Sequence, residues 1–270
     1  MSNHLHVVLH VDQERSETWS EVETVTRYTA LYPMSKRRWE AKLSQAERKK
    51  LLSEWRERLT SISWLMRALS EFIARKANQE EGTRGRFWEG RFKSQALLDE
   101  KGVLTCMAYV DLNPVRAGLA KTLEASDFTS IQERLQDMAK KKSQRRKRNA
   151  PKTLAAMHGQ ATAGQSKHIL PMSIEDYIGL LKWTGSVLAP GKRGKLAAAA
   201  PPRAKATQPD AQPTILRERG ISPEGWITAM RNQGLGATAF LGSVESLDAL
   251  AIQRGRKWLR GIGLARQMAA

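Results

Sequence analysis

The sequence predicts an α+β protein, in which a mainly antiparallel sheet with packed helices is followed by a basic linker and a helical C-terminal extension. Three observations lead to this fold class. Apolar and polar residues alternate in two segments, as they do in half-buried strands. Apolar residues recur at three- and four-residue spacing in several longer segments, as they do on amphipathic helices. After about residue 122 the composition becomes more basic and less apolar.

The first alternating segment covers residues 4–11. Side chains of a strand point to opposite faces with a period of two, so the segment predicts one core face and one working face. The core face is Leu5, Leu9 and their apolar neighbours Val7 and Val11, and the working face is His4, His6, Val8 and His10.

Two helical regions are expected next. Residues 16–31 predict a helix with Ser16 as its N-cap and Pro33 as its stop signal. Residues 44–76 predict a longer helical region that begins with a capping box at Ser44. Its core-facing residues recur with helical spacing and are Leu59, Ile62, Met66, Leu69 and Ile73.

A second strand, with a polar and basic face, is expected within residues 87–98, and a short helix over residues 99–112. An acidic residue at the start of this helix suits its positive end. The helix should stop at Asn113, because a residue before proline is disfavoured in the helical region. Tyr109 and Asn113 are four positions apart and are expected to face the same way.

The predicted organisation has three parts. Residues 1–125 form the α+β domain, residues 126–168 a basic linker, and residues 169–270 the helical extension. The linker contains the run from Lys140 to Arg148, and the extension contains a low-complexity stretch at 189–213.

The chain is strongly basic. Its 270 residues include 45 Lys and Arg against 27 Asp and Glu, a formal net charge of +18. Such an excess favours polyanionic partners, chiefly nucleic acid. No apolar run approaches the roughly 18 residues that a membrane-spanning helix needs, and no secretory leader opens the chain. The single cysteine, Cys106, fits a reducing cytoplasm and a role in packing.

The pair His4 and His6 is the first candidate for chemistry. Two imidazoles separated by one residue share a strand face and offer two neutral nitrogen ligands to one divalent metal ion. Most such pairs are not metal sites, but here Asn3 precedes the pair and a Tyr-Asn pair lies on a later helix. His10 lies two pleats beyond His6, so a solvent or DNA-backbone role suits it better than ligation.

Three sequence blocks resemble those of single-tyrosine HUH transposases, in the branch called REP-associated tyrosine transposases. Asn3-His4-Leu5-His6 is similar to the Asn-His-hydrophobic-His core of that family. The segment 109–118, Tyr-Val-Asp-Leu-Asn-Pro-Val-Arg-Ala-Gly, is similar to its tyrosine-helix signature. Phe-Trp-Glu-Gly-Arg-Phe at 87–92 resembles the strand motif between the two. The blocks occur in the family's order and extend the resemblance over about residues 1–130.

The resemblance implies a metal-dependent nuclease acting on single-stranded or hairpin DNA. His4 and His6 would ligate Mg²⁺ or Mn²⁺, with Asn113 as a third ligand. Tyr109 would attack a backbone phosphate and leave a 5′-phosphotyrosine and a free 3′-OH. The resemblance further implies strand transfer at hairpin-forming sites, a homodimer, and a bacterial, cytoplasmic protein associated with the nucleoid. Because Mg²⁺ prefers oxygen ligands, two histidines favour tighter binding of Mn²⁺.

Several cationic and aromatic residues flank the expected site. Arg86, Arg91, Lys93 and Arg116 are candidates for holding phosphates. Trp88 is a candidate for stacking on an unpaired base, although packing explains it equally well.

The chain departs from the family's pattern at its beginning. Family members carry a few dozen residues before the histidine pair, whereas Met1 here lies two residues before Asn3. We expect a chain that lacks these first elements to leave a sheet neighbour unpaired.

Two other functions stay open at this point. One is a non-catalytic relative that binds nucleic acid through its basic surface, and the other is a metallohydrolase that uses His4, His6 and His10.

Overall fold

The computed structural model describes residues 5–144, 154–158, 170–188, 212–231 and 238–269. Of these described residues, 62% are helical and 6% are in strands. The expectation of an α+β fold with a mainly antiparallel sheet is therefore wrong. The described strands form two small parallel pairs, in which β1 (Ala96–Leu97) joins β4 (Phe240–Leu241) and β2 (Met157–His158) joins β3 (Leu170–Ser173).

The expected N-terminal strand is absent from its described part. Residues 5–12 have no regular secondary structure, and Leu5, Val7 and Leu9 are exposed. A strand needs a neighbour that accepts its hydrogen bonds and a surface that covers its apolar face. The alternating pattern supplies neither by itself. The second expected strand, within residues 87–98, shrinks to β1 for the same reason.

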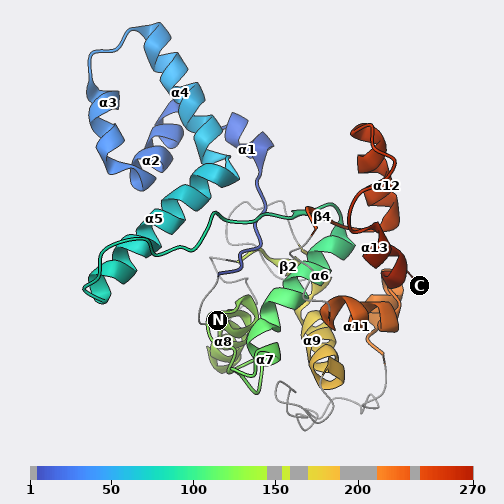
Figure 1. Cartoon of the computed structure of the whole chain (residues 1–270). Coiled ribbons are helices and arrows are strands. Elements are labelled where there is room, and N and C mark those ends of the chain that lie inside the picture. Colours follow the sequence, from blue (N-terminus) through green and yellow to red (C-terminus); the bar gives the residue numbers. More distant parts are fainter. Residues whose placement is uncertain (1–4, 145–153, 159–169, 189–211, 232–237, 270) are drawn as a thin grey trace. The chain divides into compact units, whose positions relative to one another are not determined.

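The chain divides into two compact units, Leu9–Lys93 and a second unit that combines Met1–Val8 with Ser94–Ala270. The unit Leu9–Lys93 is helical (Figure 1). Its elements are α1 (Gln13–Glu17), α2 (Glu21–Leu31), the 3-10 turn η1 (Pro33–Ser35), α3 (Lys36–Glu40), α4 (Gln45–Leu59) and α5 (Ile62–Glu80).

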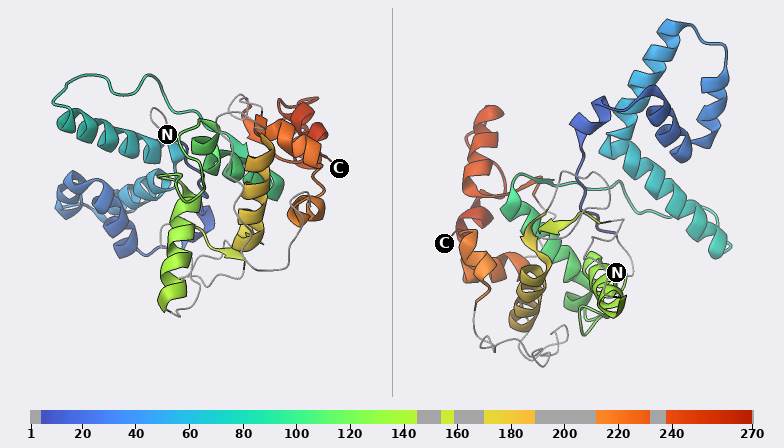
Figure 2. Two further views of the ribbon diagram at one scale, coloured as in Figure 1. Left: turned by 90° about the horizontal axis from the view of Figure 1, so that it is seen from below. Right: turned by 180° about the vertical axis from the view of Figure 1, so that it is seen from behind.

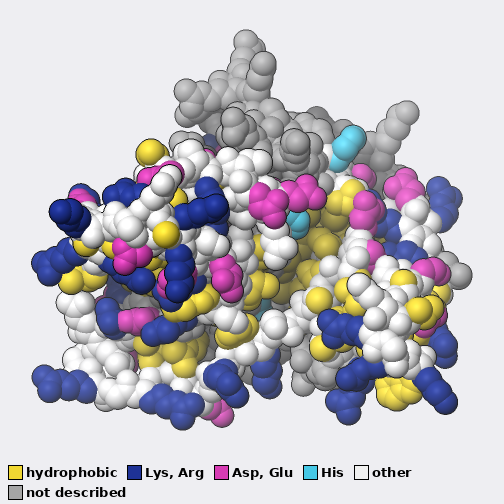
Figure 3. All heavy atoms as spheres, turned by 90° about the horizontal axis from the view of Figure 1, so that it is seen from above, with side chains coloured by type: hydrophobic (Ala, Val, Ile, Leu, Met, Phe, Trp, Pro, Cys, Tyr) yellow, Lys and Arg dark blue, Asp and Glu magenta, His cyan; other side chains and the backbone are white. Residues whose placement is uncertain are grey.

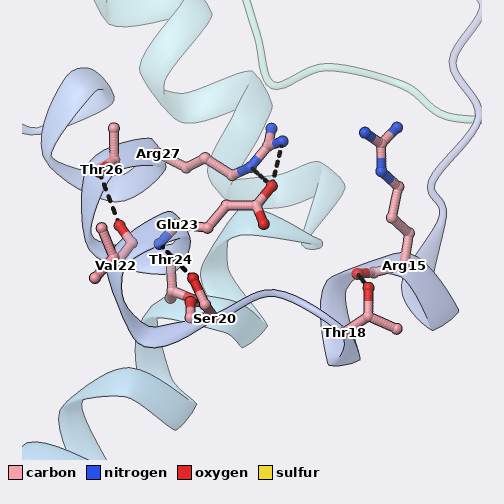
Figure 4. A network of polar contacts seen from close by, with 8 residues as sticks. All are labelled: Arg15, Thr18, Ser20, Val22, Glu23, Thr24, Thr26 and Arg27. Carbon is pink, nitrogen blue, oxygen red and sulfur yellow. Dashed lines mark hydrogen bonds and ion pairs between the residues drawn. The ribbon is translucent and has the colours of Figure 1, made fainter. Parts of the chain in front are cut away.

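Capping side chains determine where several helices of this unit begin. The predicted capping box is confirmed, because the Glu47 N–H donates to Ser44 Oγ and the Glu47 carboxylate accepts from the Ser44 N–H. The expected helix 16–31 is instead two helices. The second of these, α2, has Ser20 as its N-cap, and the Ser20 Oγ accepts from the Glu23 N–H at 3.1 Å, as Figure 4 shows. The expected helical region 44–76 also breaks, between Leu59 and Ile62.

A small aromatic core holds this unit together. Tyr28 stacks on Trp55 with ring centroids 4.4 Å apart, and Leu51 is buried beside them. Further aromatic and aliphatic side chains pack around these three and are partly buried; they include Trp39 and Leu59.

The second unit is also mostly helical (Figure 2). Its described helices are α6 (Glu100–Asp111), α7 (Asn113–Arg116), α8 (Ser130–Gln144), α9 (Ile174–Leu188), α10 (Thr214–Glu218), α11 (Pro223–Arg231), α12 (Val244–Gln253) and α13 (Ile262–Met268). The helix expected over residues 99–112 is confirmed as α6, with Asp99 as its N-cap.

One apolar core connects most of this unit. Leu104 and Leu112 of the α6 region pack with Tyr177 of α9 and Trp226 of α11, and all four are fully buried. The Trp226 indole N–H donates to the Thr184 hydroxyl at 2.9 Å, so this buried donor is satisfied. Residues 126–168, expected to be a linker, contribute Ile131 and Met157 to the same core.

Two basic or low-complexity stretches fall largely outside the described residues. In the run from Lys140 to Arg148, residues 145–148 are not described, and of the stretch 189–213 only residues 212 and 213 are. None of the helices in the described ranges is both long enough and apolar enough to cross a membrane.

Candidate functional site

Tyr109 lies in the last turns of α6, the helix that runs through the core of the second unit. Leu104, Met107 and Ala108 of this helix are buried, which fixes its orientation against α9 and α11. Tyr109 itself is only partly buried and packs against the edge of this core. The helix therefore holds the phenol on a rigid support while leaving part of its ring accessible.

His6 lies next to Tyr109, although more than a hundred residues separate them in the sequence. The two ring centroids are 6.3 Å apart and the planes cross at 78°, an edge-to-face contact. His4 lies outside the described residues, so the expected pair of imidazoles is represented here by His6 alone.

Arg116 also contacts the phenol ring. Its guanidinium carbon lies 4.3 Å from the centroid of the Tyr109 ring, which is a cation–π contact. A guanidinium held at this position is also suited to binding a phosphate oxygen, because it presents several N–H donors in one plane. The Tyr109 ring thus contacts both an imidazole and a guanidinium.

Asn113 is the first residue of α7, the single turn that follows α6. The helical path hardly breaks between the two helices, because the Leu112 N–H donates to Ala108 O and the Arg116 N–H donates to Leu112 O. Proline at the start of the second turn explains the restart, since a proline at that place lacks only an N–H that has no helical partner. Asn113 is partly buried and one helical turn beyond Tyr109.

The other expected DNA-binding residues belong to the unit Leu9–Lys93. Arg86 donates to the carbonyls of Trp88 and Glu89, at 2.8 and 2.6 Å, and so folds back on its own loop. The Trp88 indole donates to Ser70 O at 2.9 Å, and its ring contacts Phe87 edge to face. Arg91 and Lys93 are exposed. Trp88 is therefore packed within its own unit, whereas the side chains of Arg91 and Lys93 are exposed.

A buried polar cluster around Asp111, two residues after Tyr109, was not predicted from the sequence. Asp111 is 1% exposed and accepts hydrogen bonds from the hydroxyls of Tyr177 (2.7 Å) and Ser130 (2.9 Å) and from the Ile131 N–H (3.2 Å). It therefore caps the start of α8 and ties it to α6 and α9. Arg134, also buried, donates to Ala155 O at 2.8 Å. The signal in the sequence was an acidic residue within an otherwise apolar helix face.

Burial dominates the electrostatics of this cluster. Desolvation raises the pKa of Asp111, although hydrogen bonds from Tyr177 and Ser130 oppose the shift. Burial, together with the nearby Asp111 charge, raises the pKa of Tyr177 well above its ordinary value. Tyr177 is therefore a structural donor and unsuited to act as a nucleophile.

Cys106 is unsuited to nucleophilic chemistry as well. It lies on α6, packed against the core, and burial raises the pKa of its thiol to about 11. At neutral pH the side chain is a thiol, which fits the packing role expected from the sequence.

A metal-binding group of three or more His, Cys, Asp and Glu side chains does not occur among the residues that the structure describes. The expected metal ligands include His4, which lies outside the described residues, and Asn113, which would bind the metal through its amide oxygen. By donor type alone, an imidazole nitrogen of His6 and an amide oxygen of Asn113 are compatible with Mn²⁺ or Mg²⁺.

The chain was compared with protein-family models, with curated proteins and with solved structures, and none of the three comparisons finds a match.

Proposed function

We propose that this chain cuts and transfers single-stranded DNA at hairpin-forming sites, with Tyr109 as nucleophile. The observation that carries the proposal is the contact of His6 and Tyr109, two residues that the motif resemblance pairs and that lie far apart in the sequence. The tyrosine is held on a buried helix with a guanidinium beside its ring. The +18 charge favours a polyanionic substrate.

In the proposed reaction the Tyr109 hydroxyl oxygen forms a bond to a backbone phosphorus while the bond to the 3′ oxygen breaks. The products are a 5′-phosphotyrosine and a DNA strand with a free 3′-OH; the phenol's proton passes to solvent, and the leaving 3′ oxygen takes a proton from solvent. Arg116 would hold a phosphate oxygen and neutralise charge that develops there. His6 and Asn113, with His4, would bind Mg²⁺ or Mn²⁺, which withdraws charge from the phosphate.

Resolution of the intermediate follows the same geometry in reverse. A 3′-OH from another DNA end replaces the phenol at phosphorus, so the strand is rejoined without an external energy source. The proposed place of action is the bacterial cytoplasm, at the nucleoid.

The test uses hairpin DNA labelled at either end and incubated with the full chain and Mn²⁺. We expect a 3′-end label to migrate with the protein on a denaturing gel, because the phosphotyrosine retains the 3′ fragment. A 5′-end label should be released on free DNA. Tyr109→Phe should reduce the adduct to background, since phenylalanine offers no nucleophilic oxygen, while His6→Ala should weaken the response to Mn²⁺.

Tyr32→Phe is the matched control. Tyr32 is a partly buried tyrosine of the unit Leu9–Lys93, and its hydroxyl makes only a long contact to Trp64 O at 3.4 Å. This variant should form the adduct normally. An adduct that persists in Tyr109→Phe would contradict the proposal.

A non-catalytic nucleic-acid-binding protein is the second candidate. The observation in its favour is that the segment carrying His6 forms no strand, so its backbone lacks a sheet neighbour to hold the ring in place. This candidate predicts salt-sensitive DNA binding that is the same with EDTA and with Mn²⁺, and no adduct with either label.

A further inference from the structure

The segment between α12 and α13, residues 254–260, concentrates charge and one large aromatic ring. It reads Arg-Gly-Arg-Lys-Trp-Leu-Arg and holds no acidic residue. We call it the C-terminal basic loop. It belongs to the second unit and lies where Figure 1 shows the turn between the two red helices.

The backbone of this loop is fixed at both ends. At its start Gly255 has φ 63° and its N–H donates to Ile252 O, while the Arg256 N–H donates to Ala251 O at 2.8 Å. These two bonds end α12 in a Schellman motif. At the other end Leu259 is 4% exposed and packs in the small core formed by α12 and α13. The loop therefore presents its remaining side chains from a defined support.

Trp258 has an unusual environment among the tryptophans of this chain. All eight tryptophans are described, and Trp258 alone is exposed, with 62% of its surface accessible. Three others, in the unit Leu9–Lys93, have arginine guanidiniums over their rings; these are Trp19, Trp39 and Trp64. Its indole face is therefore accessible to a ligand.

The cations of the loop divide into two groups. Arg254 is the C-cap of α12, and its guanidinium lies 4.7 Å from the Phe240 ring centroid. This cation–π contact within the fold gives Arg254 a structural role. Arg256, Lys257 and Arg260 are exposed, and no carboxylate in the described part of the chain forms an ion pair with them. Three uncompensated positive charges thus surround an exposed indole.

We propose that the C-terminal basic loop is a binding site for single-stranded DNA, separate from Tyr109. Trp258 stacks on an unpaired base, and Arg256, Lys257 and Arg260 contact the flanking phosphates. An indole face pairs with any unpaired base, whereas in a duplex the base faces are covered by their neighbours. A membrane surface fits less well, because the loop offers a single apolar ring and its only leucine points into the core.

The test measures binding of a fluorescein-labelled oligothymidylate by anisotropy, using the full chain in EDTA so that no cutting occurs. We expect Trp258→Leu to weaken binding roughly tenfold, because leucine is apolar but cannot stack. Trp258→Phe keeps an aromatic face and should retain most of the affinity. Arg256→Ala/Lys257→Ala should weaken binding and reduce the slope of log affinity against log salt by roughly 1.4.

The matched control is Arg217→Ala/Arg231→Ala, which removes the same charge from exposed positions of the same unit. It should leave the salt slope unchanged. Unchanged affinity in Trp258→Leu, or an equal effect of the control pair, would overturn the proposal. A wild-type protein that does not bind oligothymidylate would also overturn it, and so would binding to phosphatidylserine vesicles in its place.

Binding of single-stranded DNA by the C-terminal basic loop does not depend on the proposed cutting reaction. Binding of oligothymidylate in EDTA requires no metal and no reaction at Tyr109, so the assay measures the loop without the proposed nuclease reaction. If the chain forms the adduct but Trp258→Leu does not change its affinity for oligothymidylate, the binding site at the loop is refuted and the proposed DNA-cutting function is not.

Discussion

Asp99 is the residue that joins the start of α6 to the start of α12. Its Oδ1 accepts from the Gly102 N–H at 2.9 Å and so caps α6. Its Oδ2 accepts from the Ser243 N–H and the Ser246 hydroxyl, both at 2.7 Å. One carboxylate thus satisfies donors at the beginning of two helices that are far apart in the sequence, one of which carries Tyr109.

The charge of Asp99 gives stability that depends on pH. Burial alone would raise the pKa of Asp99, but hydrogen bonds from Ser243, Ser246 and Gly102 outweigh it and leave the pKa below its usual value. A carboxyl whose pKa is lower when folded stabilises the fold above its unfolded pKa and loses this effect as the pH falls through its folded pKa.

We therefore predict that Asp99→Asn lowers the free energy of unfolding by about 1–3 kcal/mol near neutral pH, because charge-assisted hydrogen bonds are lost. The difference from wild type should be constant between neutral pH and about pH 5, and should shrink below about pH 4. Urea unfolding followed by circular dichroism at a series of pH values measures it. Asp248→Asn, an exposed change on α12, is the control and should show little effect at any pH. A difference that grows on acidification would contradict the assignment.

At the scale of elements, the sequence predicted where helices occur, though not all of their ends, and it predicted strands badly. The reason is that helix signals are local. The capping box at Ser44 and the N-cap at Asp99 use partners three residues away, so a short window contains the whole interaction. A strand depends on a neighbour elsewhere in the chain. β1 pairs with β4, which lies more than a hundred residues later, and no local pattern specifies that partner.

The residues of the candidate site show the same difference between local and distant interactions. Tyr109 lies on the expected helix, α6, whereas Asn113, which was expected to end that helix, is the first residue of a second helix, α7. Asp111 was missed, because its partners Ser130 and Tyr177 come from α8 and α9. The sequence shows an acidic residue there but not the donors that make its burial tolerable.

Close packing between α11 and α13 gives a prediction at this scale. A Cβ at Gly225 of α11 would lie 1.9 Å from Gln267 O of α13, so the two backbones meet at this glycine. Gly225→Ala should therefore destabilise the protein by several kcal/mol, because backbone must move to admit the methyl group.

Gly179→Ala is the matched substitution. Gly179 is exposed on α9, and a Cβ there meets nothing within 4 Å. This change should stabilise by up to about 1 kcal/mol, because alanine favours the helix over glycine. Thermal melts of both variants test the pair, and equal effects of the two changes would contradict the close approach of α11 and α13.

At the scale of the whole molecule, the excess positive charge is the dominant property. On the face shown in Figure 3, Lys and Arg side chains lie mostly towards the edges, and Asp and Glu side chains lie among them and near the middle. A formal charge of +18 repels itself in the folded state, where the charges are closest together. A polyanion that neutralises part of this charge should stabilise the fold in proportion to its binding.

Salt should therefore act in opposite directions with and without DNA. Without DNA, raising NaCl to about 0.1 M shortens the screening length to roughly 10 Å and should raise the melting temperature, because repulsion between charges weakens. An oligothymidylate in EDTA should raise the melting temperature by a few degrees at low salt. Adding NaCl should then remove that gain, because phosphate contacts are lost. An oligothymidylate with an uncharged methylphosphonate backbone is the control and should give far less stabilisation. A melting temperature that falls with NaCl alone would show that self-repulsion does not limit the stability of this fold.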